Sequence, residues 1–139
     1  MSEVGWCSLR LRFDARELQL LRGAERLRGT SMAHTARSDV LRSALSLAKA
    51  GQKVGRAVPG GTLTLEEGEL RLLLDAVRFA AQEVQWGARR DDAESNARRD
   101  AVLAAFPELV EKGTWRSFGL ARELEAVAAK LADILKAHN

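Results

Sequence analysis

The feature that most constrains the fold of this chain is an unbroken alternation of apolar and polar residues at positions 7–13, Cys-Ser-Leu-Arg-Leu-Arg-Phe. Successive side chains of a β-strand point to opposite faces. The alternation therefore predicts a half-buried β-ribbon whose apolar residues face the core. Its outer face would carry Ser8, Arg10 and Arg12.

The remainder of the chain has the composition and the spacing of helices. Leu, Ala, Arg and Glu, which favour helix, dominate the sequence. Asp14 with Glu17, and Thr64 with Glu67, have the spacing of capping boxes at helix starts. We predict a mainly α fold in which the short N-terminal β-ribbon is followed by five helices. These lie at about 15–28, from a cap at Thr35 or Ser38 to residue 50, at about 65–86, within 89–113, and at 116–137.

The last predicted helix has an apolar seam. Leu120, Leu124, Val127, Leu131 and Ile134 are separated by steps of four and three residues, which is the spacing of coiled-coil-like packing. The partner of this seam is either another helix of the same chain, in a C-terminal helical bundle, or a second chain.

A glycine-rich segment at 51–61 divides the sequence. It contains four glycines and a proline, which favour turns and linkers. We therefore expect a basic region at 1–50, a linker at 51–61 and a helical bundle at 62–139, either as separate units or around one shared core.

Two stretches of the chain resemble each other at an offset of 52 residues. Residues 11–21, Leu-Arg-Phe-Asp-Ala-Arg-Glu-Leu-Gln-Leu-Leu, are echoed by 63–73, Leu-Thr-Leu-Glu-Glu-Gly-Glu-Leu-Arg-Leu-Leu. Residues 36–41 are echoed more faintly by 97–103. One explanation is a duplicated unit. The other is that a capping box before a leucine-rich helix recurs for physical reasons alone.

Charge is divided unevenly along the chain, although its net value is only +3. Residues 1–56 hold 11 Lys/Arg and 5 Asp/Glu, whereas residues 57–139 hold 11 and 14. The asymmetry is either scatter over solvated helices or the mark of a basic binding half. The single cysteine, Cys7, cannot form an intrachain disulfide. This favours a cytoplasmic location, and the sequence predicts no signal peptide and no membrane helix.

The first third of the chain resembles the ribbon-helix-helix family of DNA-binding proteins. The resemblance rests on Ser-Leu-Arg-Leu-Arg-Phe (8–13), Arg-Glu-Leu-Gln-Leu-Leu (16–21) and Ala-Arg-Ser-Asp-Val-Leu-Arg-Ser-Ala-Leu (36–45). It implies a homodimer whose two ribbons pair and enter the major groove of double-stranded DNA. Ser8, Arg10 and Arg12 would then touch base edges, and Thr35 and Ser38 would help to bind a phosphate.

Other residues give no catalytic or metal-binding pattern. The two histidines and the one cysteine lack zinc-site spacing, and no cofactor motif occurs. We therefore expect a non-enzymatic protein without cofactor, most simply a small dimeric transcription regulator. The alternative is a helical protein-interaction module. In that case Trp86 and Trp115 are candidate anchors for a protein partner on the C-terminal helices, because tryptophan is enriched in interfaces.

Overall fold

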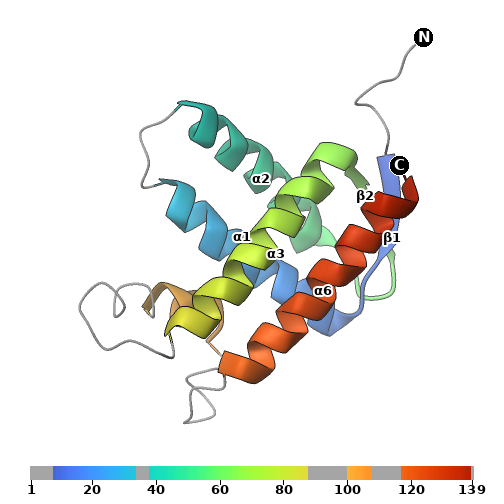
Figure 1. The fold of residues 1–139 in the computed structure, drawn as a ribbon. Helices are drawn as coiled ribbons and strands as arrows, with labels where there is room; N and C mark the ends of the chain where they lie inside the picture. Colours follow the sequence, from blue (N-terminus) through green and yellow to red (C-terminus); the bar gives the residue numbers. More distant parts are fainter. Residues whose placement is uncertain (1–7, 34–37, 88–99, 108–116, 139) are drawn as a thin grey trace.

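The computed structural model describes residues 8–33, 38–87, 100–107 and 117–138. Over these ranges the protein is mainly helical, as predicted (Figure 1). Residues 100–105 form a short additional helical segment. The principal elements are β1 (Ser8–Arg12), α1 (Ala15–Ala33), α2 (Ser38–Arg56), β2 (Thr62–Glu66), α3 (Glu67–Gly87) and α6 (Ser117–His138).

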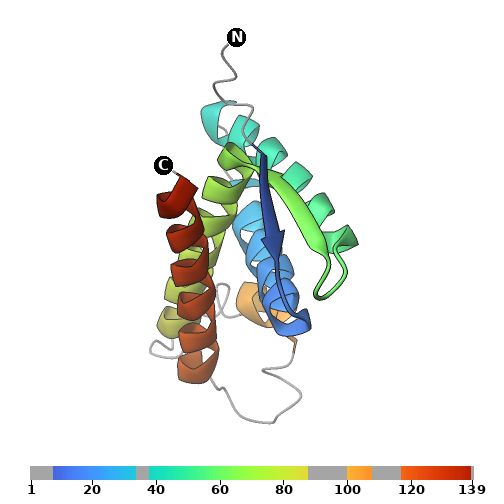
Figure 2. The same ribbon diagram turned by 90° about the vertical axis from the view of Figure 1, so that its right-hand side faces the viewer.

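The two strands form one antiparallel ribbon within the chain. β1 pairs with β2 so that Leu11 lies opposite Leu63, with Arg10 opposite Thr64 and Arg12 opposite Thr62. Figure 2 shows the ribbon on one side of the helices, with α6 beside β1 and α2 beside β2. The predicted N-terminal ribbon therefore exists, and its second strand comes from a segment about 50 residues further along the chain.

The inner face of the ribbon joins a core that is shared by all the principal helices. Leu11, Leu63 and Leu65 are buried together with Phe13, which follows β1. In the core, α1 packs against α2 and α3, and α3 packs against α6. The predicted seam of α6 faces inward from Leu120 to Leu131, and Ile134 is partly buried. Its partner is therefore α3 of the same chain.

The predicted start of the first helix is confirmed. The Asp14 carboxylate accepts a hydrogen bond from the backbone N–H of Glu17 at 2.7 Å, and the Glu17 carboxylate accepts one from the backbone N–H of Asp14 at 2.9 Å. This reciprocal pair satisfies two donors that the first turn of a helix leaves free. It fixes the point at which the ribbon ends and α1 begins.

The predicted start of the third helix was wrong by two residues, and the strand before it was missed. Thr64 lies in β2, and the helix begins at Glu67. Glu69, rather than Glu67, completes the cap, because its Oε1 accepts from the backbone N–H of Glu66 at 2.9 Å. The strand is favoured because Leu63 and Leu65 are buried on one face, which a helix starting at 65 would not achieve.

The first two helices continue beyond residues 28 and 50, where we expected them to end. α1 continues through Gly29 to Ala33, and α2 continues through Gly51 to Arg56. The predicted linker is therefore helical over 51–56, and only 57–61 connect α2 to β2. Packing overrides the low helix propensity of glycine, because Val54 beyond Gly51 is fully buried. Whether the two parts fold independently stays a prediction.

Candidate nucleic-acid interface

The outer face of the ribbon is polar on both strands. It is formed by the side chains that alternate with the buried leucines, and all six are exposed: Ser8, Arg10 and Arg12 on β1, and Thr62, Thr64 and Glu66 on β2. We call this set the ribbon face. The three β1 residues are those that the alternation predicted to point outward, and β2 doubles the width of the surface.

Burial of the inner leucines fixes which side chains form the ribbon face. A slip of one residue in the register would turn Leu11 and Leu63, which are 3% and 6% exposed, toward solvent. Because strand side chains have a period of two, register is strongly specified when one face is buried. The polar side chains are thus held on a rigid surface by the packing behind them.

Within the described residues, the guanidinium groups of the ribbon face take no part in holding the fold together. No hydrogen bond or ion pair links Arg10 or Arg12 side chains to another group within the described residues. Other arginines do link elements. Arg16 binds Glu123 of α6 at 2.7 Å, and Arg28 lies 3.1 Å from an α3 carboxylate and over the Phe79 ring at 4.6 Å.

The end of β1 is anchored by a lysine from α6. Lys130 Nζ donates to the backbone carbonyl of Arg12 at 2.9 Å and to both carboxylate oxygens of Glu17 at 3.0 Å. The same ammonium group lies 4.6 Å from the ring centroid of Phe13. These contacts satisfy the lysine on several sides, so the strand leading to the ribbon face is fixed relative to α6.

Several predicted site residues lie where the structure gives no side-chain description. Thr35 and Trp115 are outside the described residues, as is Cys7. Ser38 is the first residue of α2 and Trp86 lies near the end of α3, but their side chains are not described. The phosphate contact and the partner anchors therefore stay predictions.

The β2 residues of the ribbon face were missed in the sequence. Thr62, Thr64 and Glu66 alternate with leucines as clearly as the β1 residues do, but over only five positions. The acidic residues next to this segment are typical of a helix start, and they led to the prediction of a helix there. The offset of 52 residues was the available signal, because it aligns the segment from Leu63 with the strand segment from Leu11.

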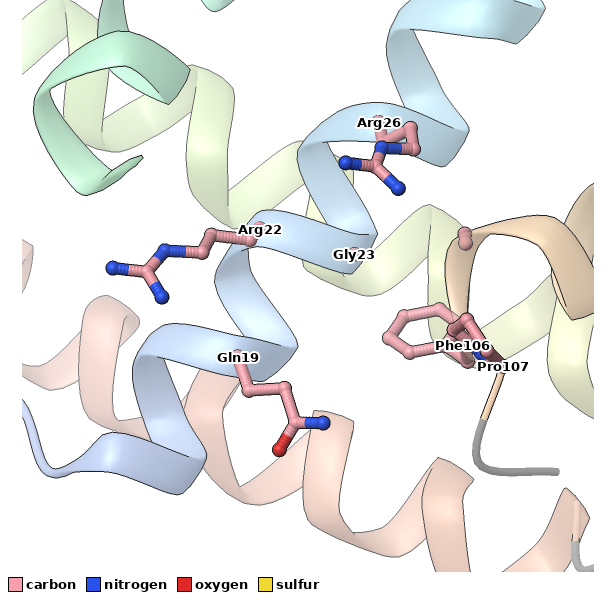
Figure 3. Close-up of a pocket in the computed structure, with 7 residues that line it drawn as sticks. Gln19, Arg22, Gly23, Arg26, Phe106 and Pro107 are labelled. Atoms are coloured by element: carbon pink, nitrogen blue, oxygen red, sulfur yellow. The ribbon is translucent and has the colours of Figure 1, made fainter. Parts of the chain in front are cut away.

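A surface hollow lies between α1 and the segment ending at Pro107. It has a volume of about 150 Å³ and carries Arg22 and Arg26 on its α1 side (Figure 3). The Phe106 ring faces Gly23, whereas Arg22 points away from it. The Arg22 guanidinium donates to three backbone carbonyls at the end of α2, at 3.2–3.4 Å, so it has a structural role.

Among the described residues, no three His, Cys, Asp or Glu side chains are grouped so as to hold a metal ion. No helix in the same ranges combines the length and the apolar character needed to cross a membrane. Comparison of the chain with protein-family models, with curated proteins and with solved structures gave no match.

Proposed function

We propose that this protein is a transcription regulator of the cytoplasm that binds double-stranded DNA through its ribbon face. The observation that carries the proposal is the pair of exposed guanidinium groups, Arg10 and Arg12, on a ribbon whose inner face is buried. The fold makes no use of these charges within the described residues. A two-stranded ribbon also has the width that the major groove of B-DNA accommodates.

The side chains of the ribbon face have the chemistry for reading base edges. Arginine forms bidentate hydrogen bonds to O6 and N7 of guanine, and Ser or Thr hydroxyls bond to several bases. The methyl group of Thr62 or Thr64 can also contact the methyl of thymine. Arg10 and Arg12 would therefore supply the main discrimination, with Ser8 and the threonines beside them.

Contacts to phosphate would come from α2. Its first residue, Ser38, would present backbone N–H groups and a hydroxyl at a helix N-terminus, with Thr35 before it. At its other end, the last turn holds the exposed Arg56 and lies beside β2 (Figure 2). These groups would orient the ribbon without reading sequence.

The proposed binding unit is one chain. The family resemblance implies that two chains pair their ribbons, but here β2 supplies the second strand. Strand pairing with a second copy is therefore unnecessary for a complete ribbon, and we propose the single chain in place of the homodimer.

The test is fluorescence anisotropy with labelled random-sequence duplex DNA over a range of salt concentrations. Wild-type protein is expected to bind with an affinity that falls steeply with salt, because bound cations release counterions from DNA. Arg10→Ala/Arg12→Ala is expected to weaken this binding and to lower the slope of log affinity against log salt by about two, because each lost cation would otherwise release about one counterion.

The matched control removes the same charge elsewhere. Arg78 of α3 and Arg122 of α6 are exposed, and Arg78→Ala/Arg122→Ala is expected to retain most of the affinity. If the two double variants lost the same affinity, the loss would be explained by net charge alone, and this would contradict the proposal. Absence of wild-type binding at low salt would do so as well, and would favour a protein partner on the C-terminal helices.

A further inference from the structure

The two halves of the chain have matching inner faces. At the offset of 52 residues, buried positions coincide along β1-α1 and β2-α3: Leu11 with Leu63, Leu18 with Leu70, Leu21 with Leu73, and Ala24 with Ala76. The capping carboxylates coincide too, since Glu17 and Glu69 each accept from the backbone N–H three residues before them. The sequence echo at 11–21 and 63–73 is therefore also an echo in structure.

The register of the ribbon relates the two halves by an approximate twofold axis. Leu11 lies opposite Leu63, which is its own counterpart. On one side of this central pair Arg10 lies opposite Thr64, and on the other side Thr62 lies opposite Arg12. Counterparts thus change places across the central pair, as they do when two identical strands pair about a twofold axis.

The lysine contacts to the two caps follow the same symmetry. Lys130 of α6 binds Glu17 at the start of α1 at 3.0 Å, and Lys53 of α2 binds Glu69 at the start of α3 at 2.6 Å. Each cap is thus held by the second helix of the other half. α2 and α6 also correspond in packing, because α2 lies against α1 and α6 against α3 (Figure 1).

The fainter sequence echo, between 36–41 and 97–103, does not mark this correspondence. Residues 100–105 form a separate short helix, and the Phe106 ring beyond it lies close to Gly23 of α1. The place of α2 in the second half is taken by α6, which starts at Ser117. The second half therefore holds an additional segment between its two corresponding helices.

We infer that the protein is a fused dimer of two β-α-α units whose ribbon face has become asymmetric, so that one chain reads a non-palindromic DNA site. The inference rests on the proposed function. Arg10 and Arg12 have Thr62 and Thr64 as their counterparts, so both guanidinium groups lie on the β1 side of the ribbon. Threonine cannot form the bidentate contact that arginine forms with guanine.

The asymmetry has a direct consequence for the DNA. A palindromic site presents the same base edges to both strands of a symmetric ribbon. This ribbon would gain arginine contacts in one half of such a site only. The preferred site is therefore expected to have guanines facing β1 and no inverted copy of them facing β2.

The experiment is selection from a pool of random double-stranded DNA with the full-length chain, followed by sequencing of the bound duplexes. Native mass spectrometry then gives the number of chains per selected duplex. We expect one chain per duplex and a motif without an inverted repeat. Thr62→Arg/Thr64→Arg, which makes the ribbon face symmetric, is expected to raise the affinity for an inverted repeat of the guanine half roughly 10- to 100-fold.

A control variant adds the same two charges away from the ribbon. Ala126 and Ala129 of α6 are exposed, and Ala126→Arg/Ala129→Arg is expected to leave the selected motif unchanged. Selection of an inverted repeat by wild-type protein, or two chains per duplex, would overturn the inference and leave DNA binding standing. The inference would also fail if Thr62→Arg/Thr64→Arg kept the wild-type motif. Absence of any enriched duplex would overturn the proposed function and the inference together.

Discussion

The segment from Ser8 to Ala33 and the segment from Thr62 to Gly87 have the same inner face and different outer faces. Behind the ribbon, leucines and alanines occupy corresponding positions and are buried alike. In front of it, Arg10 and Arg12 on one strand face threonines on the other. Most positions that the core constrains are thus retained, although the buried Val77 has Glu25 as its counterpart, and the exposed positions of the ribbon differ.

This difference separates the demands of folding from those of function. A substitution at a buried position lowers stability, because it leaves a cavity or strains the core. A substitution at an exposed position that makes no specific contacts changes stability little. Exposed positions on a rigid ribbon can therefore diverge and specialise without loss of the fold. Under this account the functional information lies in the outer, unequal residues.

The largest expected effect tests whether the inner faces are equivalent. Leu18→Ala and Leu70→Ala each remove a side chain that is 1% exposed or less. Each is expected to lower the free energy of unfolding by about 2–5 kcal/mol, because a cavity is left in a packed core. Urea denaturation, fitted with one dependence of the unfolding free energy on urea concentration for both variants, gives both values. The two inner faces would not be equivalent if one variant lost much stability and the other lost none.

The next effect tests a position where the halves differ. A Cβ at Gly23 would lie 2.8 Å from Cζ of the buried Phe106 ring. Gly23→Ala is therefore expected to cost about 1–3 kcal/mol through overpacking, in spite of the better helix propensity of alanine. The counterpart in α3 is the exposed Asp75, and Asp75→Ala is expected to cost less than about 1 kcal/mol. Thermal unfolding measures the loss of stability in both variants. A larger loss in Asp75→Ala than in Gly23→Ala would contradict this expectation.

A smaller effect tests the two lysine contacts. The Glu69 side chain is 9% exposed and that of Glu17 is 22% exposed. Lys53→Met would leave the more buried carboxylate without its cation and is expected to cost about 1–2 kcal/mol. Lys130→Met is expected to cost about 1 kcal/mol or less. Chemical denaturation at neutral pH measures both, and stabilisation by either substitution would contradict the assigned role.

The smallest effect concerns Glu25, whose counterpart is the buried Val77. Burial raises the pKa of Glu25 above its ordinary value of 4.5, and nearby Arg26 partly opposes that rise. A raised pKa in the folded state means that the ionised carboxylate opposes folding. That cost is absent below about pH 4.5 and fully present above the raised pKa. Glu25→Gln should therefore raise the melting temperature slightly at neutral pH.

A pH series of melting temperatures isolates this contribution. The difference between Glu25→Gln and wild-type protein is expected to shrink as the pH falls toward 4.5. A difference that grows on acidification would show that the ionised carboxylate stabilises the fold, contrary to this account.

Local patterns predicted the first half of the fold better than the second. The alternation around Leu11 indicated β1 and its outward arginines, and the Asp14–Glu17 spacing indicated the start of α1. Both are decided by neighbours in sequence. The segment from Gly51 was misread as the start of a linker, because the burial of Val54 depends on packing between helices.

Strand β2 depends on a partner that is distant in sequence. Thr62 to Glu66 is short and lies beside acidic residues typical of a helix start. Only pairing with β1 decides between strand and helix there. The repeat at an offset of 52 carried this information, because it placed Leu63 in register with Leu11.

Disulfide trapping between the two strands tests directly whether one chain forms the whole ribbon. Arg10 and Thr64 lie directly opposite each other on the ribbon face, so their Cβ atoms are expected to be roughly 5 Å apart. Arg10→Cys/Thr64→Cys in a Cys7→Ser background should, on mild oxidation, form a disulfide with little movement of the backbone. The control, Ser8→Cys/Thr62→Cys in the same background, places the cysteines roughly 13 Å apart along the ribbon.

Non-reducing electrophoresis and intact-mass analysis at several protein concentrations give the answer. We expect a monomeric intrachain disulfide whose yield is independent of protein concentration, with none in the control. Cross-linked dimers, or cysteines that stay reduced in the Arg10→Cys/Thr64→Cys protein, would contradict it.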